Sequence, residues 1–208
     1  MESNGGVERL PRTEVYRFHS APEEKAETAM QFRLIYQGPL DPQTSQSRVR
    51  QKHEIRRALH PQLKAAWRQF PFLARRLEYF AEQYKRDGFR FVPLINEQQA
   101  LYCSLDILFL RRDAPGNLVI SGGDLDNRIK TLFDAFRITK NKEELGSATP
   151  DPDEDPFFVL LEDDSMITEI KITTDRLLTP IVFGAGSLTD VVLIIQVTTP
   201  PIDMDDLR

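Results

Sequence analysis

The stretch that decides the fold is Gly123-Asp124-Leu125-Asp126-Asn127-Arg128-Ile129-Lys130, which continues as TLFDAF to Phe136. Its apolar residues recur at i, i+4, i+7, i+8 and i+11, and this spacing predicts an amphipathic helix with one side in the core. A loop over 111–123, rich in glycine and proline, leads into this helix. The residues of the apolar side are Leu125, Ile129, Leu132, Phe133 and Phe136.

Apolar segments on both sides of this helix predict strands, because they are short and rich in β-branched residues. A basic segment over 45–60 has helical character, and a second helix is expected to start at Pro61 and to run towards Lys85. This order predicts an α+β fold: a single domain with a mixed β-sheet and helices packed on one face. The predicted strands span 30–36, 100–111, 157–161, 166–174 and 190–199.

The composition divides the chain into a leader, one domain and a tail. Residues 1–28 are predicted to be a flexible leader, 29–199 one domain, and 200–208 an acidic tail. The domain contains the basic helical region 45–87 and the acidic loop insertion 138–156. Because the insertion is acidic and rich in proline, it is expected to be locally disordered.

The net charge of −5 over 208 residues conceals two opposite blocks. Residues 48–90 hold 12 Lys or Arg and 4 Asp or Glu, a net of +8. Residues 141–164 hold 1 Lys and 9 Asp or Glu, a net of −8. The basic block is either a solvated helix surface or a patch that faces phosphates or a partner, and charge alone does not decide between them.

Several function classes are excluded or disfavoured by what the sequence contains. The single cysteine, Cys103, allows no internal disulfide and no cysteine-based zinc site. His53 and His60 lie seven residues apart, which is not the usual spacing of a zinc-binding helix. The N-terminus has no apolar signal segment and no run of 18 apolar residues occurs, so a cytoplasmic location without membrane contact is expected.

Two acidic motifs carry the chemical interest. Asp124 and Asp126 flank the start of the predicted helix, and Asp163 and Asp164 precede a predicted strand. Taken separately, these residues are ordinary helix caps and turn residues. Lys130, one helical turn after Asp126, makes the combination less ordinary, and Asp134 follows one turn later. Converging carboxylates suit a hard divalent cation and a nearby lysine suits a phosphate, so metal-assisted phosphodiester hydrolysis is the alternative interpretation.

The order D-L-D-N-x-x-K, an apolar helix, and then D-D before a strand resembles the RusA family of Holliday-junction resolvases. The resemblance covers roughly residues 30–40 and 100–198, and it implies a RusA-like nuclease domain. It further implies an endodeoxyribonuclease that uses Mg²⁺, with Mn²⁺ as an alternative, to cut branched DNA as a homodimer in DNA recombination and repair. The chain departs from the family pattern at Met166, where the family often has glutamine.

Carried over by position, the resemblance makes Asp124, Asp126 and Asp164 the metal-binding carboxylates and Lys130 the catalytic lysine. Asn127 would orient the first motif and Asp163 would support its neighbour. The arginines expected to contact DNA are those beside the first motif: Arg111, Arg112 and Arg128. Weaker candidates for DNA contact are Lys140, Lys142 and Lys171.

Two other functions remain open from the sequence. The chain could be a module that binds DNA structures with weak or no catalysis. It could also be a protein-interaction subunit that docks a partner through the basic helices 48–90 or through the acidic loop 138–156.

Overall fold

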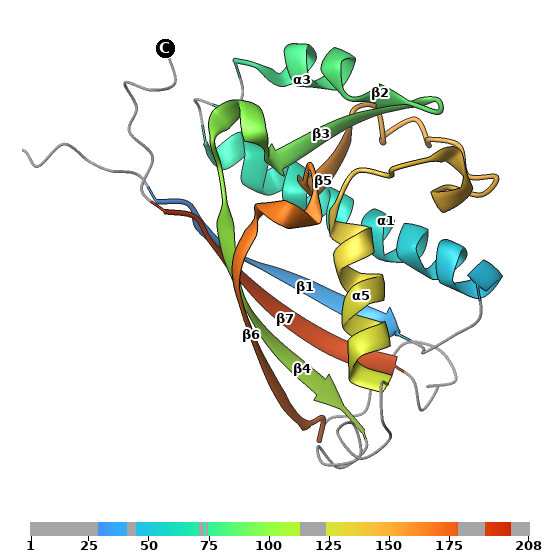
Figure 1. The fold of residues 1–208 in the computed structure, drawn as a ribbon, viewed down its shortest axis with the longest axis vertical. Coiled ribbons are helices and arrows are strands. Elements are labelled where there is room, and N and C mark those ends of the chain that lie inside the picture. The colour runs from blue at the N-terminus through green and yellow to red at the C-terminus, as the bar shows by residue number, and fades with distance from the viewer. Residues whose placement is uncertain are drawn as a thin grey trace, which may run out of the picture.

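The computed structural model describes residues 29–40, 45–70, 73, 75–112, 124–178 and 190–200. The predicted leader, the loop before residue 124 and the tail from 201 lie outside these residues. Within them the chain forms a single α+β domain in which three helices accompany two mixed sheets (Figure 1). The sequence predicted one sheet. The second was missed because it is built partly from 85–95, for which no strand was expected.

The larger sheet has the order β1-β7-β4-β6. β7 pairs antiparallel with both of its neighbours, whereas β4 and β6 run parallel. Alternate residues of the two central strands are buried, as period-two burial requires. All four strands were predicted, and their bounds are β1 (Gln31–Pro39), β4 (Cys103–Arg111), β6 (Ile167–Arg176) and β7 (Asp190–Thr198).

The smaller sheet has the order β2-β3-β5, with β2 (Lys85–Arg86), β3 (Phe89–Ile95) and β5 (Phe157–Leu161). β3 contains Pro93, a residue that normally argues against an inner strand. β2 pairs only with the first two residues of β3, so Pro93 has no β2 residue opposite it. The edge of β3 that continues past the end of β2 therefore tolerates a residue without an N–H group.

The first helix is longer than expected. α1 (Ser45–Gln69) runs through Pro61, so the prediction of a new helix at this proline is wrong. An internal proline costs a helix about 3 kcal/mol. Burial of each large apolar side chain contributes about 1.5–3 kcal/mol, and the helix buries several on either side of the proline. The buried residues are Ile55, Leu59, Leu63 and Trp67.

Two further helices complete the domain. α3 (Leu77–Gln83) lies against β3, and α5 (Asp124–Phe136) is the helix that the opening motif predicts. α1 and α5 cover the same face of the larger sheet (Figure 1). The chain leaves α5 at Arg137, which forms a parallel bridge with Leu161 at the end of β5. This bridge brings the segment after α5 beside the turn that follows β5.

The acidic insertion 138–156 is ordered, contrary to expectation, because it is paired with the basic helix α1. Arg57 binds the nearly buried Glu154 through Nε and Nη2, at 2.8 and 3.0 Å, and also donates to the Thr149 carbonyl. Lys64 donates to the Asp153 carbonyl at 3.0 Å. Part of the opposite charge of the two blocks is therefore neutralised within the domain.

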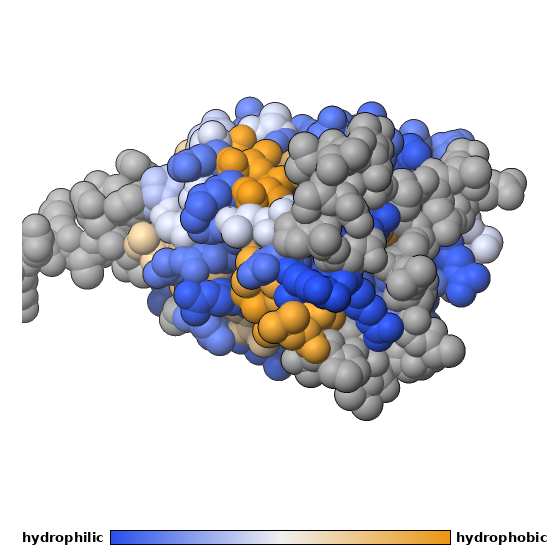
Figure 2. All heavy atoms as spheres, turned by 90° about the horizontal axis from the view of Figure 1, so that it is seen from below, coloured by the Kyte–Doolittle hydropathy of each residue, from blue (hydrophilic) through white to orange (hydrophobic). Residues whose placement is uncertain are grey.

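On the opposite face of the larger sheet, the apolar residues of the two central strands are only partly buried, among them Leu108 and Ile194. Large apolar side chains are also exposed elsewhere on the molecule, as at Leu178. Viewed from below, hydrophobic side chains lie exposed among hydrophilic ones (Figure 2). Of the helices in the described ranges, none is long and apolar enough to cross a membrane.

Candidate functional site

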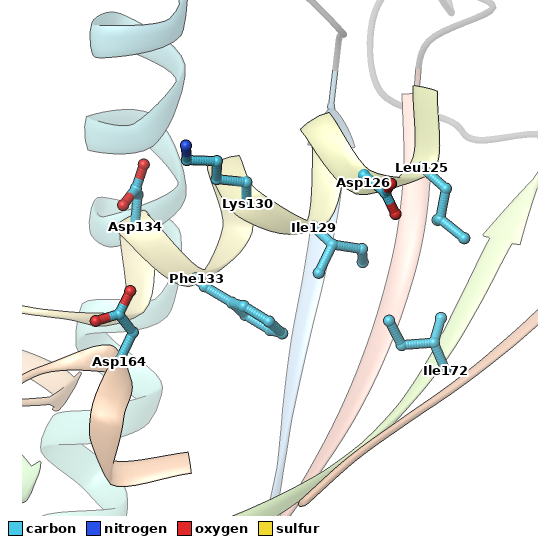
Figure 3. A pocket seen from close by; sticks show the side chains of 8 residues that line it. All are labelled: Leu125, Asp126, Ile129, Lys130, Phe133, Asp134, Asp164 and Ile172. Atoms are coloured by element: carbon cyan, nitrogen blue, oxygen red, sulfur yellow. The ribbon is translucent and has the colours of Figure 1, made fainter. Parts of the chain in front are cut away.

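A pocket of about 290 Å³ lies between α5 and the turn that follows β5 (Figure 3). Four charged residues and four apolar residues line it, so it combines an acidic and basic rim with an apolar wall. The lining residues are Leu125, Asp126, Ile129, Lys130, Phe133, Asp134, Asp164 and Ile172. Three of the four catalytic residues proposed from the sequence are among them.

The spacing of α5 explains one side of the pocket. Asp126, Lys130 and Asp134 follow at intervals of four residues and therefore share a face of the helix. Asp126 lies in the first turn, and Asp134 lies eight residues further, about 12 Å along the axis. Asp164 lies at the Asp134 end of the pocket, so Asp126 and Asp164 stand at opposite ends (Figure 3).

The second motif is held in a short turn. Asp163 caps the 3-10 helix η3 (Asp164–Met166), and its carboxylate accepts a hydrogen bond from the Ser165 amide at 3.1 Å. Partial burial alone would raise the pKa of Asp163. The hydrogen bond from the Ser165 amide and the Lys140 ammonium outweigh this effect and hold the pKa well below its usual range. Met166, where the sequence departs from the family pattern, is buried in the core.

Lys140 binds both aspartates of this motif. Its Nζ lies 3.2 Å from Asp163 Oδ2 and 3.7 Å from Asp164 Oδ1. The sequence suggested Lys140 only as a weak candidate for DNA contact. Its contact with the acidic pair was missed because it depends on the bridge between Arg137 and Leu161.

Asp134 has a different environment from the other carboxylates of the pocket. Its Oδ2 lies 2.6 Å from Lys52 Nζ, and its Oδ1 lies 2.8 Å from Arg137 Nη2. Burial alone would raise the pKa of Asp134, but Lys52 and Arg137 have the larger combined effect, so the pKa lies below its usual value. Arg137 also makes two hydrogen bonds, of 2.9 and 3.0 Å, with Glu144. Both oxygens of Asp134 are thus occupied, and the residue forms part of the pocket wall.

Asp126 and Lys130, by contrast, make no ion pair with any other residue in the described ranges. Both are exposed on α5. A carboxylate and an ammonium on adjacent turns that are not engaged in the fold remain available to a ligand.

The remaining predicted residues are distributed around this site. Asp124 is the first residue of α5, but its side chain lies outside the description. Asn127 is exposed, and its backbone carbonyl accepts a hydrogen bond from the Thr131 hydroxyl. Lys142 is exposed on the 3-10 helix η2 (Lys142–Glu144), and Lys171 pairs with Asp106 at 2.8 Å.

The three arginines proposed to contact DNA differ in how far they are exposed. Arg111 and Arg128 are only 7% and 3% exposed. The Arg128 guanidinium donates to the Leu40 carbonyl, which ties the start of α5 to the end of β1. Arg112, just after β4, is partly exposed. In this conformation two of the three arginines belong to the interior.

The donor chemistry of the pocket fits a hard divalent cation, because Asp126 and Asp164 supply carboxylate oxygens and no soft ligand is present among the lining residues. Among the residues that the structure describes, no three acidic, histidine or cysteine side chains are grouped closely enough to hold a metal ion. The side chain of Asp124, the proposed third carboxylate, lies outside the part of the chain that the structure describes.

Comparison of the chain with protein-family models, with curated proteins and with solved structures finds no match. The residues of the pocket and the two acidic motifs that supply them are therefore the basis for inferring a function.

Proposed function

We propose that this protein is a Mg²⁺-dependent endodeoxyribonuclease that hydrolyses phosphodiesters in branched DNA such as Holliday junctions. The observation that carries the proposal is the pocket, which joins Asp126 and Lys130 of α5 to Asp164 from a separate turn. These are three of the four residues for which the resemblance to the RusA family implies catalysis.

Each residue has a role that its chemistry supports. Asp126 and Asp164, with Asp124, would hold the cation, which supplies positive charge and a water of lowered pKa when it is bound. Lys130 places an ammonium one turn from Asp126, where it stabilises negative charge on a phosphate oxygen. Leu125, Ile129 and Phe133 exclude water along one side.

The substrate and the assembly follow from the same resemblance. A homodimer would present two such pockets and nick two strands of one junction, as DNA recombination and repair require. Mn²⁺ would substitute for Mg²⁺ because it accepts the same oxygen ligands. A cytoplasmic location accords with this role.

A second candidate is a module that binds DNA structures without cutting them. The separation of Asp126 from Asp164 along the pocket favours it, because one cation needs ligand oxygens about 2.0–2.6 Å away. A partner-docking role for the basic helix is less well supported, since Arg57 and Lys64 are already engaged by the acidic insertion.

The test is cleavage of labelled four-way junctions, flaps and forks by the full-length protein in Mg²⁺ and in EDTA. The proposal predicts Mg²⁺-dependent nicking that Asp126→Asn and Lys130→Ala each reduce by about 100-fold or more. Glu143→Gln, which removes an exposed acid of η2, should cut like the wild type. Junction binding without cleavage in any divalent cation would favour the second candidate.

A further inference from the structure

The contact of Lys140 with Asp163 and Asp164 has a geometry that suggests a role at the proposed metal site. Its ammonium lies within 4 Å of an oxygen of each aspartate, which is where a cation bound by these residues would also place its charge. Asp164 is at the same time a lining residue of the pocket. The lysine thus offsets part of the negative charge of the acidic pair in the absence of a divalent ion.

The backbone around Lys140 is fixed from both sides. Arg86 donates to the Thr139 carbonyl at 3.2 Å, and the Lys140 amide donates to the Glu144 carboxylate at 3.2 Å. Glu144 is in turn held by Arg137. The main chain is therefore anchored, and the part of Lys140 that can move is its side chain.

The ion pairs themselves are weakly held. The Lys140 side chain is 53% exposed, and those of Asp163 and Asp164 are 35% and 47% exposed. Ion pairs in such solvated positions stabilise a fold little, because water screens both charges. The lysine can therefore leave the aspartates without disturbing the domain, unlike the buried Lys52 beside Asp134.

We infer that Lys140 is an exchangeable internal counter-ion, which occupies the Asp163–Asp164 pair until a divalent cation displaces it. This inference rests on the proposed function, because it takes Asp164 as a ligand of that cation. Lys140 is then a positioning residue that sets how tightly the cation binds and that offsets part of the charge of the acidic pair when the cation is absent.

The experiment is a direct titration of Mn²⁺ into the metal-free full chain, followed by calorimetry and without DNA. Lys140→Gln should bind Mn²⁺ about three- to tenfold more tightly than the wild type, since a competing charge near the ligands is removed. Lys140→Arg keeps the charge and should bind like the wild type. Lys85→Gln, which removes an exposed lysine on β2, should also leave the affinity unchanged.

The outcomes separate this inference from the proposed function. Mn²⁺ binding by the wild type, with equal or weaker binding by Lys140→Gln, overturns the counter-ion role and leaves the metal site standing. Equal tightening by Lys85→Gln overturns it as well, because the effect would then be one of net charge. Absence of Mn²⁺ binding by all four proteins overturns both the metal site and the inference.

Discussion

Lys52 on α1 and Asp134 on α5 form a close ion pair, with 2.6 Å between Nζ and Oδ2. Both side chains are largely buried, and Arg137 completes the interaction on the other oxygen of Asp134. The pair joins the long basic helix to the wall of the candidate site. It also distinguishes Asp134, whose contacts belong to the fold, from Asp126, whose carboxylate pairs with no other described residue.

Asp134→Ala should lower the free energy of unfolding by about 3 kcal/mol, because it leaves the buried Lys52 without its carboxylate partner and removes one of the two carboxylates that bind Arg137. Asp126→Asn is the matched control on the same helix face. It should change stability by less than about 0.5 kcal/mol, since Asp126 is exposed. Chemical denaturation of both variants measures the difference, and equal losses would contradict the separation of the two roles.

Glu154 should fix the acidic insertion on α1. Its carboxylate accepts hydrogen bonds from Arg57 and from the Asp151 amide. Glu154→Ala should lower the free energy of unfolding by about 1–3 kcal/mol, because the Arg57 guanidinium and the Asp151 amide lose a buried acceptor. Hydrogen exchange should then accelerate over 142–156. Asp153→Asn is the control, because Lys64 binds the backbone carbonyl of Asp153 and not its side chain. Equally fast exchange in this variant would contradict the specific role of Glu154.

Stability should also depend on pH through His53, whose side chain is 7% exposed. Burial, assisted by the charges of Arg57 and Arg56, lowers the pKa of His53 to about 4. The unfolded chain therefore binds a proton that the folded chain rejects between pH 6.5 and 4. The contribution of His53 to the free energy of unfolding is therefore fully present above about pH 6.5. It is lost as the pH falls towards 4, by about 3 kcal/mol in total.

His53→Phe tests this dependence, because the ring already contacts Phe89 and Phe157. Unfolding measured from pH 7 to 4 should show a shallower loss than in the wild type. Some slope should remain, since burial also lowers the pKa of His60. An unchanged slope in His53→Phe would show that His53 is not the group responsible.

Local patterns were sufficient for α5 and for the strands of the larger sheet. The apolar spacing from Leu125 to Phe136 and the β-branched run around Ile194 accompany burial, and these elements form as predicted. β6 also forms as predicted, although Ile170 and most of its other residues are exposed. Pro61 misled the prediction, because packing along α1 tolerates a proline that a local rule reads as a break. The strand β3, which contains Pro93, was not predicted.

The candidate site was predictable only in part. The spacing of Asp126, Lys130 and Asp134 places them on one helix face, and the interval from Asp134 to Arg137 suits an ion pair within a helix. Lys52 and Lys140 could not have been linked to the site in this way. Their contacts depend on how α1 and the segment after α5 pack, and residues far apart in sequence leave no periodic signal of such a contact.

Asp126 and Lys130 are proposed to serve a metal-dependent reaction on DNA. The most direct measurement is the single-turnover rate of four-way junction cleavage as a function of Mg²⁺ concentration, for the wild type and Asp126→Asn. We expect a rate that rises with Mg²⁺ and saturates in the wild type, and that is lower by about 100-fold or more in the folded variant. A folded wild type that leaves the junction intact at every Mg²⁺ concentration, or a variant that cuts as fast as the wild type, would contradict it.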